Sequence, residues 1–206
     1  MNPVVNQNKI ETFSELFNII LTEDKDLSRN ASKGVRKLLY SSVCRDKSEK
    51  IHLIIQNAPF VYRNIKEEFR QENFVTAVSV MYFLHDRDDE PDFLFPWLFE
   101  LIQHKNGNIR YSAERMICNE LGPLTYHIRC PGEKSSLRDL PADQADNIIY
   151  KLFVGLNNMA FNLYKPQYKK YKYINSLPTG SYKTIQRVLS EIRDDCGEDY
   201  MRRLGM

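Results

Sequence analysis

Apolar residues recur at intervals of three and four along almost the whole chain, which is the period of an α-helix that buries one face. The run Phe13, Leu16, Phe17, Ile20 and Leu21 is the first case. No segment of the first 122 residues alternates apolar and polar side chains for long enough to indicate a strand. Glycine supplies only 8 of 206 residues, about half its usual share, as expected where turns are few. The pattern therefore predicts an all-α fold.

Turn and capping residues divide this pattern into ten helices. Thr12 and Glu15 have the spacing of a capping box before the first helix, and Asp46 and Glu49 repeat that spacing before the third. A polar stretch, 22–30, is expected to separate the first two helices. Proline ends the third helix at Pro59, and the Gly122-Pro123 pair ends the seventh. The predicted apolar stripes span 13–21, 35–43, 51–55, 61–69, 74–85, 95–102, 109–121, 124–129, 148–163 and 185–192.

Two short motifs suggest an internal repeat. Val35-Arg36 and Ile109-Arg110 are 74 residues apart and are expected at matching places in the second helix of a pair. Half of that spacing is about 37 residues, the length of a two-helix solenoid unit. The best single unit spans 92–121, with Pro96 near the start of its first helix and a polar turn at 105–108. In its second helix the small Ala113 lets the pair approach closely, while Arg110 can bond to the turn or to a neighbouring unit.

This unit resembles a HEAT repeat, whose first helix contains a proline and whose second helix opens with an apolar residue followed by arginine. The resemblance implies an α-α superhelix of HEAT-like or armadillo-like helix pairs over 10–122. The helices of 123–206 would form a C-terminal extension that packs on the repeats within a single all-α domain, 1–206. Seven predicted helices before Gly122 do not divide into pairs, so one unit could be an armadillo-like triple. An irregular helical bundle is the alternative.

No arrangement of residues indicates catalysis, a metal or a cofactor. The four histidines form neither HExxH nor an i,i+4 ligand pair, and His127-x-x-Cys130 is only half of a metal site. The acidic run 86–92 has proline and tryptophan where a calcium loop needs glycine and glutamate. Nucleophile-elbow and phosphate-loop motifs do not occur. We therefore expect a non-catalytic protein without a cofactor or a bound metal.

The charge and the apolar content of the chain limit its expected cellular location and its expected binding partners. No secretory signal opens the chain, and no run approaches the roughly 20 apolar residues of a bilayer crossing, so a cytoplasmic protein without a membrane contact is expected. The cysteines share no CxxC spacing and are interpreted as thiols; they are Cys44, Cys118, Cys130 and Cys196. A formal net charge of +2 excludes general polyanion binding but leaves room for a local basic patch.

One segment, 164–173, is unusual because lysines and tyrosines alternate in it. It contains Tyr164, Lys165, Tyr168, Lys169, Lys170, Tyr171, Lys172 and Tyr173. If a helix continues beyond Pro166, Tyr164, Tyr168 and Tyr171 share one face and the lysines lie on the adjacent one. Basic side chains neutralise phosphates and tyrosines stack on bases, so the segment is a candidate partner-binding surface. In the alternative interpretation the tyrosines pack on the core while the lysines extend to water.

The leading hypothesis is a non-catalytic helical-repeat protein that acts as a protein-protein interaction scaffold or adaptor, with a protein as its partner. Solenoids expose a long curved surface for such partners. The alternative is a nucleic-acid-binding HEAT-like protein that uses the segment 164–173, in one version similar to the HEAT-like alkylpurine DNA glycosylases. None of the catalytic residues of that family can be assigned to this chain.

Overall fold

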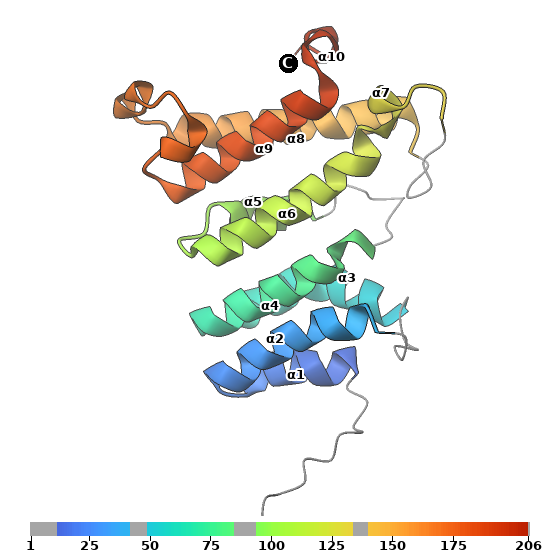
Figure 1. Ribbon diagram of the computed structural model, residues 1–206, viewed down its shortest axis with the longest axis vertical. Coiled ribbons are helices and arrows are strands. Elements are labelled where there is room, and N and C mark those ends of the chain that lie inside the picture. The colour runs from blue at the N-terminus through green and yellow to red at the C-terminus, as the bar shows by residue number, and fades with distance from the viewer. Residues whose placement is uncertain (1–11, 42–48, 85–93, 134–139, 206) are drawn as a thin grey trace, which may run out of the picture. The chain divides into compact units, whose positions relative to one another are not determined.

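The structure is a computed structural model that describes residues 12–41, 49–84, 94–133 and 140–205 (Figure 1). Within these ranges the chain forms the α-helices α1 to α10 and three short 3-10 helices, with no strand. The all-α prediction is therefore confirmed. The chain divides into two compact units, residues 1–85 and 86–206, each of which is described by itself.

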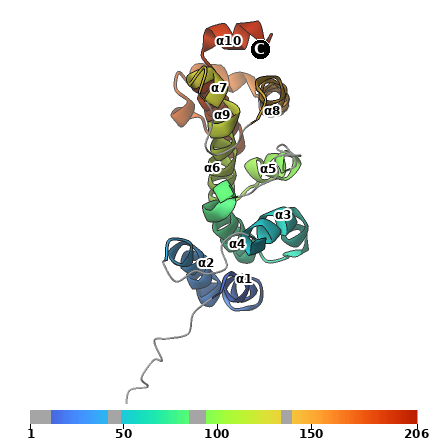
Figure 2. The same cartoon turned by 90° about the vertical axis from the view of Figure 1, so that its right-hand side faces the viewer.

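The first unit consists of two helix pairs. α1 packs on α2, α2 packs on α4, and α3 packs on α4, as Figure 2 also shows. Phe17 and Phe74 meet edge to face in its core, with ring centroids 5.7 Å apart. The helices are α1 (Phe13–Thr22), α2 (Lys25–Leu39), α3 (Glu49–Asn64) and α4 (Glu68–Met81), followed by the 3-10 helix η1 (Tyr82–Leu84).

The capping box predicted at Thr12 and Glu15 is present at the start of α1. The break predicted at 22–30, in contrast, is wrong, because α2 begins at Lys25 with Asp24 as its cap. The buried face of α2 is made of small side chains, Ser28, Ala31 and Ser32, before it reaches the larger apolar residues. Buried serines satisfy their hydroxyls by hydrogen bonds, so a hydropathy pattern does not distinguish this face from a loop.

The prediction that Pro59 ends a helix is also wrong, since Pro59 lies inside α3. An interior proline costs about 3 kcal/mol or more. The apolar stripe of α3 nevertheless continues past it, with Ile51, Ile55, Ala58 and Tyr62 all buried. Each large apolar side chain contributes about 1.5–3 kcal/mol on burial, so the sum outweighs the lost hydrogen bond. The helix predicted at 61–69 is consequently shared between α3 and α4.

The second unit has two layers, with α5 and α8 in one and α6 and α9 in the other (Figure 2). α6 packs on α5, α8 and α9, and α8 packs on α9. The helices are α5 (Phe95–Ile102), α6 (Gly107–Leu124), α7 (Tyr126–Arg129), α8 (Ala142–Leu163), α9 (Gly180–Cys196) and α10 (Glu198–Arg203), with 3-10 helices η2 (Pro166–Lys170) and η3 (Ile174–Ser176) between α8 and α9.

Gly122 and Pro123 do not end α6, which runs to Leu124. Gly122 does not have the positive φ of a left-handed cap. The apolar face of α6 includes Leu121 and Leu124, both buried, so packing again extends a helix through its proline. Gly197, which has φ +76°, separates α9 from α10, a short helix that the periodicity does not predict.

These corrections bring the number of helices up to Leu124 to six, α1 to α6, within the described residues. Six helices divide into pairs, so the armadillo-like triple is not needed. Several sequence features lie outside the described residues, namely Val43, Cys44, the cap at Asp46, His85 and the acidic run 86–92.

In the second unit, the residues that suggested a repeat lie in the two helices in which the sequence placed them. Pro96 is in the first turn of α5, and Ile109 and Ala113 are completely buried on α6. Nη1 of Arg110 donates hydrogen bonds to the carbonyls of His104 (2.7 Å) and Lys105 (2.8 Å) in the turn before α6. Arg110 therefore fixes the turn of its own helix pair.

Val35 and Arg36 do not occupy the matching place. Arg36 is in the last turn of α2 and is exposed, whereas Arg110 is in the first turn of α6. The repeat offset was wrong because α2 begins ten residues before Val35, within the stretch expected as a loop. Only the buried Val35 contributes to the core.

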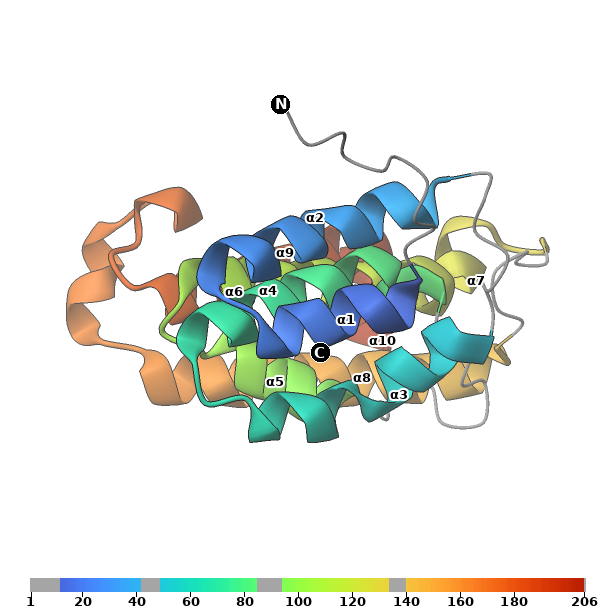
Figure 3. The same cartoon turned by 90° about the horizontal axis from the view of Figure 1, so that it is seen from below.

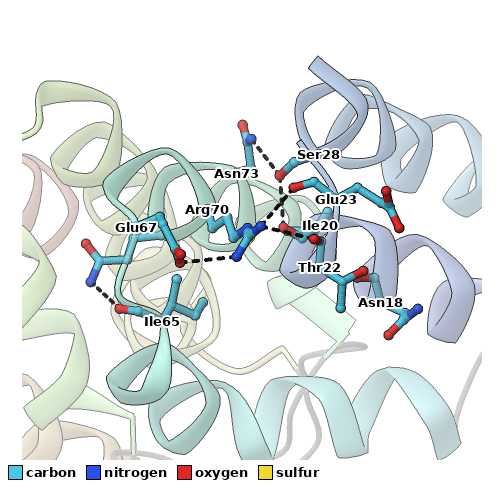
Figure 4. A network of polar contacts seen from close by, with 10 residues as sticks. Asn18, Ile20, Thr22, Glu23, Ser28, Ile65, Glu67, Arg70 and Asn73 are labelled. Carbon is cyan, nitrogen blue, oxygen red and sulfur yellow. Dashed lines mark hydrogen bonds and ion pairs between the residues drawn. The ribbon is translucent and has the colours of Figure 1, made fainter. Parts of the chain in front are cut away.

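Arg70, in the first turn of α4, makes contacts similar to those of Arg110 (Figure 4). Its Nη2 donates to the carbonyls of Thr22 (3.0 Å) and Glu23 (3.1 Å), in the turn between α1 and α2. Nearby, the amide of Asn73 donates to the hydroxyl of Ser28 at 2.9 Å. These bonds join the second helix pair to the first, which stabilises the unit beyond its apolar packing.

Candidate functional site

The segment 164–173 does not continue α8 as an α-helix. α8 ends at Leu163, and Lys165 has the extended backbone that a residue before proline favours. Pro166 then opens the 3-10 helix η2. Tyr164, Tyr168 and Tyr171 consequently do not form the shared α-helical face that a continued helix would give.

Tyr168 anchors this segment to α9. It is only 4% exposed, and its ring lies 5.1 Å from the ring of Tyr182 and 6.1 Å from that of Tyr164, between centroids. Burial, together with the neighbouring Tyr164 and Tyr168, raises the pKa of Tyr182. The interpretation of the tyrosines as core residues therefore holds for Tyr168 but not for the others.

Two cationic side chains of α9 donate hydrogen bonds to Asn175, two residues beyond the segment 164–173. Nζ of Lys183 donates to the carbonyl of Asn175 at 2.7 Å, and Nη2 of Arg187 donates to Oδ1 of Asn175 at 2.8 Å. Arg187 also pairs with Glu114 at 3.6 Å. The loop between α8 and α9 (orange in Figures 1 and 3) is thus fixed to the helix that follows it.

The four lysines of the segment are all exposed: Lys165, Lys169, Lys170 and Lys172. Nζ of Lys170 lies 5.1 Å from the ring centroid of Tyr171, and Nζ of Lys172 lies 5.5 Å from that of Tyr173. No ion pair to any of the four lysines occurs among the residues that the structure describes. Their charges are therefore available to a partner.

The sequence around this segment has an unusual charge pattern. From 147 to 190 the chain contains seven lysines and arginines and no carboxylate, and from 101 to 113 it contains Lys105 and Arg110 and again no carboxylate. Packing brings these two stretches together. The hydroxyl of Ser181 donates to the carbonyl of Gln103 at 3.1 Å, and a Cβ atom at Gly180 would lie 2.0 Å from Nη2 of Arg110.

We call this end of the second unit, where α8 ends and α9 begins, the cationic end. Its charged members are Lys105, Arg110, Lys165, Lys169, Lys170, Lys172, Lys183 and Arg187. Positive charges gathered in this way produce a local field that attracts polyanions, even on a protein whose net charge is near zero. The candidate site of the sequence analysis is therefore part of a larger surface.

A small hollow of about 180 Å³ opens on the cationic end. Five tyrosines contribute to its walls, together with the lysines Lys169 and Lys172. The tyrosines are Tyr164, Tyr168, Tyr171, Tyr173 and Tyr182. Tyr173 is 64% exposed, whereas Tyr168 is buried, so the hollow has a fixed aromatic floor and an open aromatic rim.

The opposite end of the second unit contains a polar cluster that joins three helices. Nε2 of His127 (α7) lies 2.7 Å from Oδ1 of Asp146 (α8), and the hydroxyl of Tyr200 (α10) donates to the same oxygen. The neighbouring hollow of about 660 Å³ is lined in part by Cys196. Burial, with Asp195 and Asp146, raises the pKa of that thiol to about 11. A protonated thiol is a poor nucleophile. The contacts among His127, Asp146 and Tyr200 join α7, α8 and α10, so we interpret the cluster as structural.

Within the described residues, no group of three or more histidine, cysteine, aspartate or glutamate side chains is placed to hold a metal ion. The pair His127 and Cys130 is not joined by further ligands in that part of the chain. None of the described helices has the length and apolar character that a bilayer crossing requires.

The sequence analysis selected the segment 164–173 as a candidate surface but did not include Lys105, Tyr182, Lys183 and Arg187 of the cationic end. The absence of carboxylates from 147 to 190 was a signal that could have indicated the last three. The stretch 101–113 could not be added from sequence, because its proximity follows from the packing of α6 on α9.

The comparisons with known proteins give no relative: no family model, no curated protein and no solved structure matches this chain.

Proposed function

We propose that this chain is a non-catalytic helical-repeat protein that binds an acidic macromolecule through its cationic end. The HEAT-like character is part of the proposal. It is supported by the succession of pairs α1–α2, α3–α4 and α5–α6, and by the bonds of Arg110 to the turn of its pair. In such arrays each pair buries its apolar face on its neighbours, which leaves broad surfaces for binding.

The observation that carries the proposal is the convergence of two stretches without carboxylates. Eight cations gather at one end of the second unit, and the carboxylate of Glu114 pairs with one of them, Arg187. Like charges repel one another, so this arrangement does not favour folding by itself. A polyanion relieves the repulsion, and the release of its counterions drives binding.

A charge-reversal experiment with a matched control tests the proposal. The test variant changes Lys165, Lys169, Lys170 and Lys172 to glutamate in the chain of 206 residues. The control changes the exposed lysines of the first unit, Lys25, Lys33, Lys37 and Lys66, to glutamate. Each set lowers the net charge by eight, from +2 to −6, so the two proteins differ only in where the charge lies.

Binding to heparin, a soluble polyanion, is measured by fluorescence anisotropy over a range of salt concentrations. We expect the parent and the control to bind, with affinity that falls steeply as salt rises, and the test variant to lose binding. Equal loss in both variants, or no binding of the parent at low salt, would overturn the proposal.

A second candidate function, a protein-protein interaction scaffold, is favoured by an apolar stripe on α8. Tyr150, Val154 and Phe161 are 45%, 36% and 82% exposed. They follow one another at spacings of four and seven, which places them on one line along the helix. Exposed apolar stripes of this kind accept an amphipathic helix from a partner.

The scaffold function is tested by cross-linking in native lysate with the parent, Phe161→Glu and the neighbouring exposed control Asn162→Glu. A protein captured by the parent and the control but lost with Phe161→Glu is expected. The same set of proteins captured by all three would contradict a docking role for the stripe.

A further inference from the structure

The tyrosine hollow gives the cationic end a second chemical character besides its charge. A surface that only attracts carboxylates or phosphates needs cations, and aromatic rings add little to it. Here five tyrosines and two lysines line one concave site of about 180 Å³. Flat aromatic rings beside ammonium groups are the combination that proteins use to bind unpaired nucleobases and their phosphates.

The hollow is already formed in the free protein. Its floor is fixed because Tyr168 is buried against Tyr182, with the ring planes 36° apart. The chain beyond its rim is held by the bonds from Lys183 and Arg187 to Asn175. A site that is ordered before binding loses less conformational entropy when its ligand arrives.

The rim is open to a ligand. Tyr173 is 64% and Tyr164 is 38% exposed. Nζ of Lys172 lies within 5.5 Å of the ring centroid of Tyr173. This places a positive charge next to an accessible aromatic ring, so a base stacked on the ring would bring its phosphate close to the ammonium group.

We infer that the cationic end binds single-stranded nucleic acid, with a base in the tyrosine hollow and the flanking phosphates on Lys169 and Lys172. The inference rests on the proposed function and names the partner of the same surface. A duplex keeps its bases stacked and paired, so it offers phosphates but no free base face to the hollow. An acidic protein offers carboxylates without a flat ring system.

The experiment compares ligands that share charge but differ in free bases. Fluorescence anisotropy at low salt measures the affinity of the 206-residue chain for a single-stranded oligonucleotide of about 12 nucleotides, which is within the range of known site sizes. Competition with the corresponding duplex and with heparin is measured in the same way. We expect the single strand to bind more tightly than the duplex. The logarithmic salt slope should fall in magnitude by about 1.4 when Lys169 and Lys172 become glutamine, at roughly 0.7 for each phosphate contact.

Tyr173 supplies the specific test. Tyr173→Ala should weaken single-strand binding by about 5-fold to 150-fold, the range for loss of one stacked base, and leave heparin binding unchanged. Tyr173→Phe keeps the ring and should retain the affinity. Tyr40→Ala is the matched control, because Tyr40 is 69% exposed and lies in the first unit.

The outcomes separate the two levels of the proposal. Equal affinity for single strand, duplex and heparin, with no effect of Tyr173→Ala, would overturn the single-strand inference and leave polyanion binding in place. Tyr40→Ala weakening binding as much as Tyr173→Ala would also overturn it. No binding of any of the three polyanions at low salt would overturn both.

Discussion

Substitution of Gly180 by alanine tests how the two stretches of the cationic end are joined. A Cβ atom at position 180 would lie 2.0 Å from Nη2, 2.4 Å from Cζ and 2.9 Å from Nε of Arg110. Real Cβ atoms do not tolerate such distances. Either the start of α9 moves away from α6, or the guanidinium leaves its place.

The loss of stability expected for Gly180→Ala follows from the contacts of the Arg110 guanidinium. Its two hydrogen bonds, to the carbonyls of His104 and Lys105, measure 2.7 and 2.8 Å. Hydrogen bonds from charged donors contribute about 1.5–3 kcal/mol each. Arg110 is partly exposed, so water replaces part of this loss. The flexible Arg110 side chain can move aside, and the alanine itself restricts the unfolded chain, so we expect Gly180→Ala to lower the free energy of unfolding by about 1–2 kcal/mol.

The effect of Gly180→Ala on the free energy of unfolding should change sign when Arg110 is absent. In an Arg110→Ala background the added methyl group meets no guanidinium. Alanine also restricts the unfolded chain more than glycine does, so there Gly180→Ala should stabilise the protein by about 0.4–1 kcal/mol. The two substitutions are thus strongly coupled.

The assay is urea-induced unfolding, followed by circular dichroism, of the four proteins in this double-mutant cycle. Fluorescence anisotropy with heparin on the same proteins would report whether the cationic end is still assembled. If Gly180→Ala changes stability equally in both backgrounds, within about 0.5 kcal/mol, the contact between Gly180 and Arg110 does not hold these stretches together.

Three further predictions concern other parts of the molecule. Burial raises the pKa of Glu114, against the lowering effect of Arg187, so its contribution to stability is full below the ordinary carboxyl pKa and is lost as pH rises through the higher folded value. Glu114→Gln should remove this part of the pH dependence in urea unfolding, and an unchanged profile would contradict it. Burial, with nearby carboxylates, raises the pKa of Cys118 to about 12 and that of Cys196 to about 11. At mildly alkaline pH both thiols should react with a maleimide on the order of a hundredfold more slowly than in urea-unfolded protein, and rapid labelling of either of these two thiols in the folded protein, located by peptide mass spectrometry, would refute this. Pro59→Ala should raise the free energy of unfolding by about 1–3 kcal/mol, because alanine supplies the missing helical N–H; a lower midpoint of thermal unfolding would contradict it.

Apolar periodicity predicted the helices wherever large apolar side chains form the buried face. α1 and α5 were predicted close to their observed limits for this reason, and the stripe predicted at 185–192 lies inside α9. α2 was missed over its first half because its buried face there is made of Ser28, Ala31 and Ser32. The ends predicted at Pro59 and Pro123 were wrong, since the burial of neighbouring apolar residues outweighs the cost of an interior proline.

The candidate site was likewise predicted from the sequence only in part. Its lysines and tyrosines at 164–173 stand together in the sequence, but their conformation does not follow from it. Pro166 prevents an α-helical continuation, and the ring of Tyr182, from the next helix, determines which tyrosine is buried. Local composition therefore identified the segment, and contacts across the loop determined which of its side chains a partner can reach.

The sequence by itself determined the all-helical class and the run of 147–190 without carboxylates, because residue periodicity and charge are properties of neighbours along the chain. Only the tertiary structure decided that Gly180 lies against Arg110 and that the turn at 103–108 joins the cationic end. Contacts between residues far apart in the sequence depend on the free energy of packing whole helices against one another. A local sequence pattern does not determine that packing free energy.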